Sequence, residues 1–459
     1  MHIPASRTDQ ISSTHPAFAQ PSVLSNTQRN YMLFVLFIVY SMAMADRNIM
    51  GVLIQPVQAE FGISDGAMGL LTGLAFALFY SVLAIPFGRY ADRSNRRNLV
   101  AWCCLAWSIA TALCGLAVGF WTLAAARVAV AIGEAGGSAP SVSMIADAYP
   151  TEQRSRAMGI YMLGAHFGVL FGLGAGAWIA QEYGWRHVFI WMAIPGMVVA
   201  MLLRFTCVEP RRKTMQLESA DIPQTQEKFL QVLHSLRKNH AFVGIATAGV
   251  ILTFAGQAIG IWNTSFLVRS YGLSLKEAGA IFGVLGASAA VTGALISAWL
   301  TDRLIRRDVR WQLWLPAIGV MISIPFGIYF YLAPAAGVWP LWGMKVPHAL
   351  PAYLVFGVLM SFWVPPTYAA LTNVVPSTRM ATAMAIFGLC ASAVGGGLGP
   401  LIVGLISDGL TASYGKESLR YGMVAMVGCC LVAVLCYLLS LKDYVRMVKS
   451  PEATPTRQQ

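Results

Sequence analysis

The sequence predicts an all-α membrane protein with twelve transmembrane helices in two pseudo-symmetric six-helix bundles. Composition is the first reason, because hydrophobic residues make up 57% of the 459 residues and charged residues only 11%. Soluble proteins have about 25% charged residues. The second reason is a series of apolar runs long enough to cross a bilayer, and the third is that the second six runs resemble the first six.

The apolar runs predict helices because only helices and closed barrels satisfy the backbone in lipid, and barrel strands alternate in polarity. Seven runs are free of charged residues: 66–88, 98–126, 157–181, 241–268, 278–301, 380–407 and 421–441. Five more are interrupted or double-length: 31–54, 120–146, 187–203, 311–344 and 346–373. Together they predict twelve helices.

The basic residues predict the orientation. If both termini and every loop after an even-numbered helix are cytoplasmic, 24 of the 32 lysines and arginines lie on that side. Cytoplasmic loops are enriched in lysine and arginine, so we expect both termini in the cytoplasm. Anionic lipid headgroups then account for the net charge of +12, and no nucleic-acid partner is expected.

These patterns divide the chain into five parts. The N-terminal tail is polar, lacks the apolar core and cleavage site of a signal peptide, and is predicted to be disordered. Two helical bundles follow, joined by a cytoplasmic linker and ended by a second tail. The expected boundaries are 1–29 for the first tail, 30–204 and 241–441 for the bundles, 205–240 for the linker and 442–459 for the last tail.

An internal repeat relates the two bundles. "GRYADRSNRR" at 88–97 recurs as "AWLTDRLIRR" at 298–307, and the same offset of 210 aligns "FGIS" at 61 with "YGLS" at 271. "PTEQRSRAMGIY" at 150–161 matches "PSTRMATAMAIF" at 376–387 at an offset of 226, the difference being absorbed by a longer loop around "VWPLWGMKVPHALP". Two homologous six-helix halves are typical of a major-facilitator transporter.

The repeated basic motif predicts a cytoplasmic gate. A glycine allows a helix end to approach its neighbour, an aspartate can face a positive helix end, and arginines can pair across the two halves in an outward-open state. The alternative is that the arginines only determine topology. The expected gate residues are Gly88, Asp92, Arg93, Arg97, Asp302 and Arg303.

Four charged residues lie within predicted helices of the first bundle. They are Asp46 and Arg47 in the first helix and Arg127 and Glu134 in the fourth. Arg127 and Glu134 are seven residues apart, so they lie two turns apart on one face of their helix. A charge at mid-helix costs about 2.5–3.5 kcal/mol on insertion scales, so these groups must be paired or hydrated. They predict a substrate headgroup site at the arginines and proton exchange at the carboxylates. Static salt bridges between the two helices are the alternative.

The second bundle has no counterpart charges. The repeat offsets place Gly256, Gln257, Tyr353 and Met360 where the first bundle has its charged residues, which predicts a cavity ionisable on one side and apolar and aromatic on the other. "FAGQAIGIWN" and "FWVPPTYAALTN" supply candidate substrate contacts, with core packing as the alternative. The candidates are Gln257, Trp363 and Tyr368.

His166 could titrate near neutrality and take part in proton coupling, although a membrane histidine is more often a hydrogen-bonded core residue. The eight cysteines form no C-x-x-C pair and no cysteine–histidine set at metal spacing, so neither a metal nor another cofactor is expected. "GLTASYGKES" at 409–418 does not fit a P-loop, because the required Ser or Thr is replaced by Glu417. We therefore predict no enzyme, and energy from a gradient.

The first half resembles the Spinster branch of the major facilitator superfamily. The segments are "ADRNIMGVL", "VLAIPFGRYADRSNRRNL", "GEAGGSAPSVSMIADAYP" and "QRSRAMGIY". This resemblance implies proton-linked movement of amphipathic lipids, such as lysophospholipids or sphingoid phosphates, with Asp46, Arg47, Arg127 and Glu134 at the polar site.

The predicted function is therefore proton-coupled, alternating-access transport of amphipathic lipids by a monomer in the plasma (inner) membrane. Symport of small organic anions is one alternative, since such symporters also have an Asp-Arg in the first helix and a Glu in the fourth. A non-transporting lipid-binding membrane protein is the other.

Overall fold

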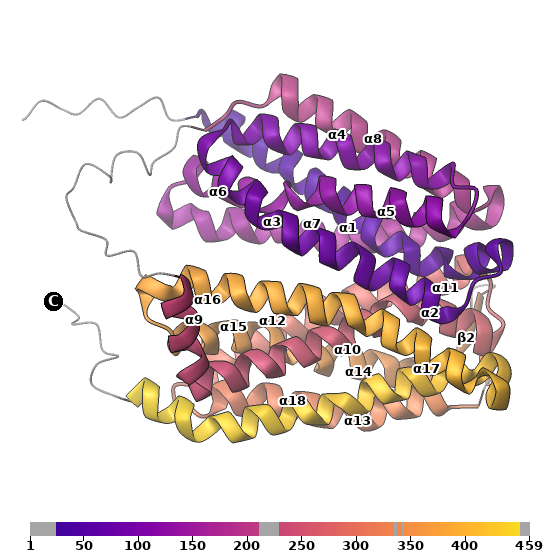
Figure 1. Cartoon of the computed structure of the whole chain (residues 1–459). Helices are drawn as coiled ribbons and strands as arrows, with labels where there is room; N and C mark the ends of the chain where they lie inside the picture. Colours follow the sequence, from indigo (N-terminus) through magenta and orange to yellow (C-terminus); the bar gives the residue numbers. More distant parts are fainter. Residues whose placement is uncertain (1–23, 211–228, 335–336, 342–343, 450–459) are drawn as a thin grey trace, which may run out of the picture.

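The structure is a computed structural model that describes residues 24–210, 229–334, 337–341 and 344–449 (Figure 1). Of the predicted tails and linker, 1–23, 211–228 and 450–459 lie outside the described residues. The first six crossings are α1 (Asn26–Phe61), α2–η1–α3 (Asp65–Gly69, Leu70–Leu74, Ala75–Arg93), α4 (Arg96–Gly115), α5–α6 (Phe120–Ala135, Ser138–Ala148), α7 (Thr151–Tyr183) and α8 (Trp185–Thr206).

The second bundle follows a short helix, α9 (Phe229–Lys238), which belongs to the predicted linker. Its crossings are α10 (His240–Tyr271), α11–η3–α12 (Leu275–Ile281, Phe282–Gly286, Ala287–Leu304), α13 (Trp311–Leu332), α14–η4–α15 (Leu350–Met360, Ser361–Trp363, Val364–Asn373), α16–η5–α17 (Ser377–Cys390, Ala391–Leu398, Gly399–Tyr414) and α18 (Ser418–Lys449). The loop expected before α14 contains an antiparallel hairpin, β1 (Val338–Leu341) and β2 (Met344–Pro347).

Eleven stretches of the described chain are long and apolar enough to span a membrane. The last, Thr382–Lys449, has 68 residues and contains α17 and α18, separated at the 3-10 turn η6 (Gly415–Glu417). Gly415 has φ 54°, a left-handed conformation that ends a helix and suits glycine. This stretch therefore crosses twice, which confirms twelve crossings.

The helix ends reproduce the repeat. Gly62 and Gly272, which are 210 residues apart, both end helices in the left-handed conformation, with φ 64° and 63°. Ser64 and Ser274 then cap the next helices by accepting hydrogen bonds from backbone N–H groups. Equivalent turns in the two halves give equivalent helix directions, as two homologous bundles require.

Transmembrane helices 4 and 10 are both interrupted within the bundle. Helix 4 breaks between Ala135 and Ser138, and helix 10 narrows to the 3-10 turn η4 at Ser361–Trp363, which lies at the repeat offset of 226. Helices interrupted near the middle of the membrane are a feature of transporter binding sites. Glu134 lies directly before the first interruption.

The two halves meet at the end of the molecule opposite the predicted cytoplasmic surface, termed the extracellular end. Segment α17 packs on α2, and α11 packs on α7 (Figure 1). The hydrogen bonds between the halves at this end join α1, α2 and α7 to α10, α11 and α17. Farther along, Ser81 and Ser392 are 3.0 Å apart. Because the halves are joined at this end, the conformation is closed on the extracellular side and faces inward.

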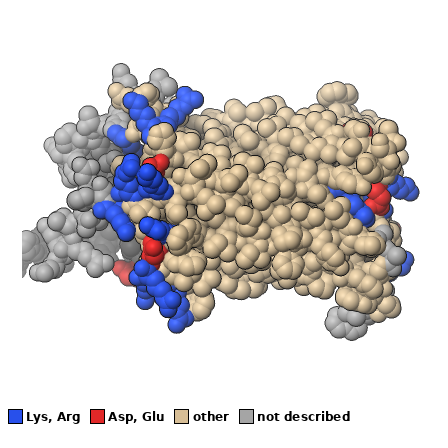
Figure 2. Space-filling model, turned by 90° about the horizontal axis from the view of Figure 1, so that it is seen from below, with Lys and Arg blue, Asp and Glu red and all other residues tan. Residues whose placement is uncertain are grey.

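The charge distribution agrees with the predicted orientation. Lysine and arginine side chains gather at the end of the molecule where α1 begins and α9 lies, a broad uncharged band follows, and a smaller charged group lies at the opposite end (Figure 2). The basic end is expected at the cytoplasmic surface and the uncharged band in the bilayer.

Candidate substrate site in the N-terminal bundle

Arg47 and Glu134 join transmembrane helices 1 and 4. The Nε of Arg47 donates to Oε2 of Glu134 at 2.5 Å. The Glu134 side chain is completely buried, whereas 27% of the Arg47 side chain is exposed. The pair is therefore a charge-assisted contact in which the cation alone reaches an accessible surface.

Aromatic rings surround the exposed side of this pair. The Arg47 guanidinium lies 4.3 Å from the ring centre of Tyr80 and 5.2 Å from that of Phe76. Tyr40 stacks on Tyr161, with ring centres 4.7 Å apart. A guanidinium over aromatic faces is stabilised by the ring quadrupoles, so Arg47 can remain charged with little water.

Asp46 and Arg127 form a second, deeper contact. Asp46 points toward α4, where its Oδ2 accepts a hydrogen bond from Thr111 at 3.1 Å, and its backbone oxygen accepts one from Nη1 of Arg127 at 3.2 Å. Asp46 is 4% exposed and Arg127 is 1% exposed. Neighbouring helix residues point about 100° apart, so Asp46 faces the bundle interior while Arg47 faces Glu134.

Two glycines position transmembrane helix 4 (α5–α6) beside transmembrane helix 3 (α4). A Cβ on Gly133 would lie 2.8 Å from the backbone nitrogen of Trp107, and one on Gly136 would overlap the Cys103 sulfur. Only glycine permits this approach. Glu134 lies between these contacts, and its Oε1 and the Nε of Arg127 have no hydrogen-bond partner among the described residues.

The predicted residues of the C-terminal half are distributed differently. Tyr368 is 44% exposed and packs edge-on against Phe387. Gln257 is exposed and Trp363 is half-buried. A substrate-contact role for these three residues stays a prediction.

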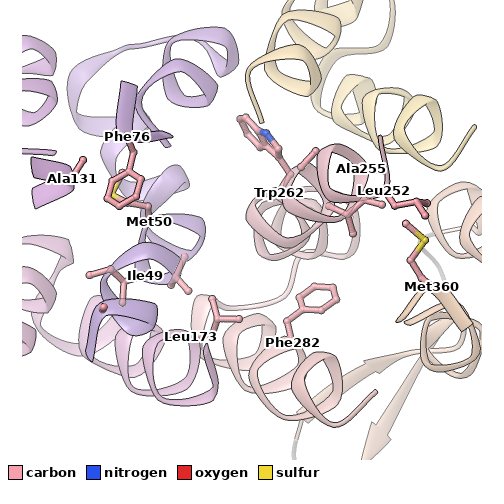
Figure 3. Close-up of a cluster of buried hydrophobic side chains, with 14 of the residues drawn as sticks. Ile49, Met50, Phe76, Ala131, Leu173, Leu252, Ala255, Trp262, Phe282 and Met360 are labelled. Carbon is pink, nitrogen blue, oxygen red and sulfur yellow. The ribbon is translucent and has the colours of Figure 1, made fainter. Parts of the chain in front are cut away.

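Tyr353 forms hydrogen bonds, although the repeat predicted that it would line the apolar side of the cavity. The amide of Asn263 donates to the Tyr353 hydroxyl at 3.2 Å and accepts from Tyr331 at 2.6 Å, and all three side chains are buried. The surrounding interior is apolar, with Phe282 on this side of the molecule and Ile49 and Met50 in the first bundle (Figure 3). This triad was not predicted, because Asn263 and Tyr353 are 90 residues apart.

His166 does not join the cluster. It is half-buried in α7, its Nδ1 has no partner among the described residues, and no hydrogen bond or ion pair in that part of the chain connects it to the four charged residues. A role in proton coupling stays a prediction.

The expected cytoplasmic gate residues are separate in this inward-facing conformation. The side chains of Asp92, Arg93, Asp302 and Arg303 are exposed, and a Cβ on Gly88 would have no neighbour within 4 Å. Arg97 lies within the first half, where its Nη1 donates to the Cys207 backbone oxygen at 2.8 Å. A gate formed by these residues therefore stays a prediction for the opposite conformation.

Arg96, which is not among the predicted gate residues, is 3% exposed and connects three segments. It donates to Asp147 at 2.5 Å, to Glu209 at 2.8 Å and to the Pro210 backbone oxygen at 2.9 Å. The basic run alone gives no signal that separates this buried arginine from its exposed neighbours.

An extracellular network also escaped prediction. Arg269 binds both carboxylate oxygens of Asp65 at 2.6 Å, and Ser407 donates to the same carboxylate at 2.6 Å. Asp408 accepts from the backbone N–H groups of Asp65 and Gly66 at 2.9 and 2.8 Å, at the start of transmembrane helix 2. The repeat offset of 226 aligns Glu182 with Asp408, but this alignment does not indicate which residues Asp408 contacts.

A two-bundle fold with interrupted helices and a charged central cluster defines a secondary transporter. The Major Facilitator Superfamily model matches residues 36–400, and the chain belongs to that superfamily. An MFS-type efflux pump of Mycolicibacterium smegmatis is 29% identical over 414 residues, 90% of this chain and 92% of that protein. The zebrafish (Danio rerio) sphingosine-1-phosphate transporter SPNS2 is 27% identical over 391 residues, covering 81% and 74%.

A solved structure shows the same arrangement. The bacterial homologue of the human lysosomal transporter Spinster, in an inward-facing and unoccupied conformation, has a TM-score of 0.81 and 28% identity, over 93% of this chain and 100% of that one. The Spinster resemblance is thereby confirmed. The protein is a multi-pass membrane transporter and not an enzyme.

Proposed function

We propose that the protein moves amphipathic lipids with an anionic headgroup, of the lysophospholipid or sphingoid-phosphate type, in exchange with or together with protons. The Arg47–Glu134 pair is the observation that supports this most. It combines a partly exposed cation with a fully buried carboxylate at 2.5 Å, so a substrate anion and Glu134 compete for one guanidinium.

Competition for Arg47 couples binding of the substrate anion to binding of a proton. Protonation of Glu134 removes its negative charge and releases Arg47 for the headgroup, whereas deprotonation restores the internal pair. An arginine stays protonated in proteins, so the proton must be held by a carboxylate or a histidine. Asp46, buried against Thr111, is the second carboxylate available for this step.

The acyl or sphingoid chain would occupy the opposite side of the cavity. Tyr368, which is 44% exposed, would present its ring there with Phe387 packed behind it, while the charged residues belong to the other half. The zebrafish relative is named as a sphingosine-1-phosphate transporter, which is an amphiphile of this kind. The relative named as an efflux pump favours outward movement across the plasma (inner) membrane, and we propose a monomer as the transporting unit.

Flux of a labelled lysophospholipid into liposomes that contain the purified protein tests the proposal. We expect saturable flux that increases with an imposed pH gradient. Glu134→Gln mimics the protonated carboxyl and should retain lysolipid binding while losing the response to the gradient. Full gradient-driven flux in this variant would move the proton to Asp46 or His166.

Glu60→Gln is the matched control. Glu60 also pairs with an arginine, Arg186 at 2.6 Å, but at the exposed extracellular end of α1. This variant should transport normally. A labelled small carboxylate tests the alternative substrate. Flux of the carboxylate without lysolipid flux would establish the organic-anion alternative. Flux of neither compound would favour a lipid-binding protein that does not transport.

A further inference from the structure

A groove at the cytoplasmic end of the first bundle shares no residue with the charged cluster. It is formed by the beginning of α1, the end of α6 and the beginning of α7, and has a volume of about 570 Å³. This is within the range of about 300–1,000 Å³ for ligand sites. Because the groove lies at the cytoplasmic end, the order of its polar and apolar residues indicates which kind of ligand it can bind.

Polar groups occupy one end of the groove. Arg29 lies 5.1 Å from the ring centre of Tyr149 and donates to Gln153 at 2.8 Å. Arg156 is exposed at the same end. Neither arginine forms an ion pair with an acidic residue in the described part of the chain, and the buried Nε of Arg29 has no hydrogen-bond partner there.

The other end of the groove is apolar and continues toward the middle of the bilayer. Leu33, Phe34, Phe37 and Ile160 line it. Phe34 is 58% exposed, and Phe37 packs on Phe167, which is 57% exposed. Two basic headgroup contacts followed by exposed rings match the order of an acidic headgroup and its acyl chains.

Helix geometry places this groove along the edge of the first bundle. Ile160 and Trp178 are 18 residues apart, five turns, and so share one face of α7. Trp178 is 40% exposed and packs on Tyr183, which contacts Trp191 at 4.9 Å, an aromatic group of the kind found at membrane interfaces. Gly174, which lies beside Gly283 of the other half, is only about 40° around α7 from this face, so the groove lies at the edge between the membrane-facing side of α7 and the other half.

We propose that this groove binds an anionic diacyl phospholipid of the cytoplasmic leaflet. Basic pockets between transmembrane helices on the cytoplasmic side bind acidic lipid headgroups. Arg29 and Arg156 hold the phosphate, and Tyr149 and Gln153 keep Arg29 in place. The acyl chains cover Phe34 and Ile160. The site does not depend on the substrate proposed above, since it shares no residue with the charged cluster.

Native mass spectrometry of the detergent-purified full chain with added phosphatidylglycerol or phosphatidylcholine tests this site. We expect preferential binding of phosphatidylglycerol. Each arginine near the surface contributes about fivefold in affinity, so Arg29→Gln with Arg156→Gln should weaken phosphatidylglycerol binding about thirtyfold. Glycerol phosphate at the same concentration should not compete, because it lacks the acyl chains.

The matched control is Arg306→Gln with Arg307→Gln, which removes two exposed charges from the same membrane side outside the groove. It should bind phosphatidylglycerol like the wild type. Arg156→Gln alone, at an exposed position, keeps the test valid if the double variant does not fold, with about fivefold weaker binding expected. Equal binding of phosphatidylcholine, unchanged binding by the groove variants, or an equal loss in the control would overturn the proposal.

Discussion

Arg269 and Asp65 join the two halves by a two-pronged ion pair, with both nitrogen–oxygen distances at 2.6 Å. Arg269 belongs to transmembrane helix 7 and Asp65 begins helix 2. The same carboxylate accepts from Ser407. This contact closes the extracellular side in the inward-facing conformation, and it must break when the transporter opens outward.

Arg269→Gln should therefore favour the outward-open state. Hydrogen bonds to charged groups contribute about 1.5–3 kcal/mol, so the shift in population should be roughly tenfold to hundredfold. Hydrogen–deuterium exchange should show faster uptake in α2 and in the part of α17 that packs on it. Arg420→Gln is the control, because Arg420 pairs with Glu417 within one half at the same membrane surface. Unchanged exchange in Arg269→Gln would exclude this pair as a latch.

Gly69→Ala should oppose closure of the extracellular side. A Cβ at Gly69 would overlap the Pro400 backbone oxygen in the other half and lie 2.7 Å from the Cα of Leu401. Such overpacking costs about 1–3 kcal/mol, so the melting temperature of the inward-facing protein in detergent should fall. Gly174→Ala, with open space around the new methyl group, should be neutral or slightly stabilising. Equal effects would contradict close packing at Gly69.

Gly88→Leu tests the predicted cytoplasmic gate. No atom lies within 4 Å of a Cβ at Gly88 in the inward-facing structure, so the free energy of unfolding should stay within about 0.5 kcal/mol of the wild-type value. Lysolipid flux should nevertheless fall if helix ends meet at Gly88 in the outward-open state. Normal flux in this variant would remove Gly88 from the gate.

Arg96→Gln should destabilise the N-terminal bundle strongly. Removing one partner of a buried ion pair costs about 3–5 kcal/mol, and here Asp147 and Glu209 both lose their cation. Thermal unfolding in detergent measures the loss. Arg93→Gln, at an exposed neighbouring position, should change stability by less than about 0.5 kcal/mol. A similar melting temperature for both variants would mean that Arg96 is solvated.

Much of the fold could be predicted because membrane insertion depends on local composition. About twenty apolar residues span the bilayer wherever they occur, and flanking arginines set the direction. The crossings and the orientation follow from such segments. The 68-residue stretch Thr382–Lys449 was separable in the same way, since Lys416, Glu417 and Arg420 interrupt it.

The residues of the charged cluster could be predicted, but the pairs that they form could be predicted only in part. The cost of a charge in the membrane identified Asp46, Arg47, Arg127 and Glu134 as groups that need partners. Helical periodicity could not assign those partners, because a side chain's rotation about its helix is fixed by packing against other helices. The structure pairs Arg47 with Glu134 and directs Asp46 to Thr111.

The membrane class, the twelve helices and their orientation could be predicted because each depends on residues close together in the chain, and the repeat was found by comparing two segments of one sequence. Which side is closed and which charges meet became known from the tertiary structure. The contact between Asp65 and Asp408 spans 343 residues, and Arg96 reaches Glu209 over 113. Such pairs depend on how separate helices pack, which hydropathy does not encode.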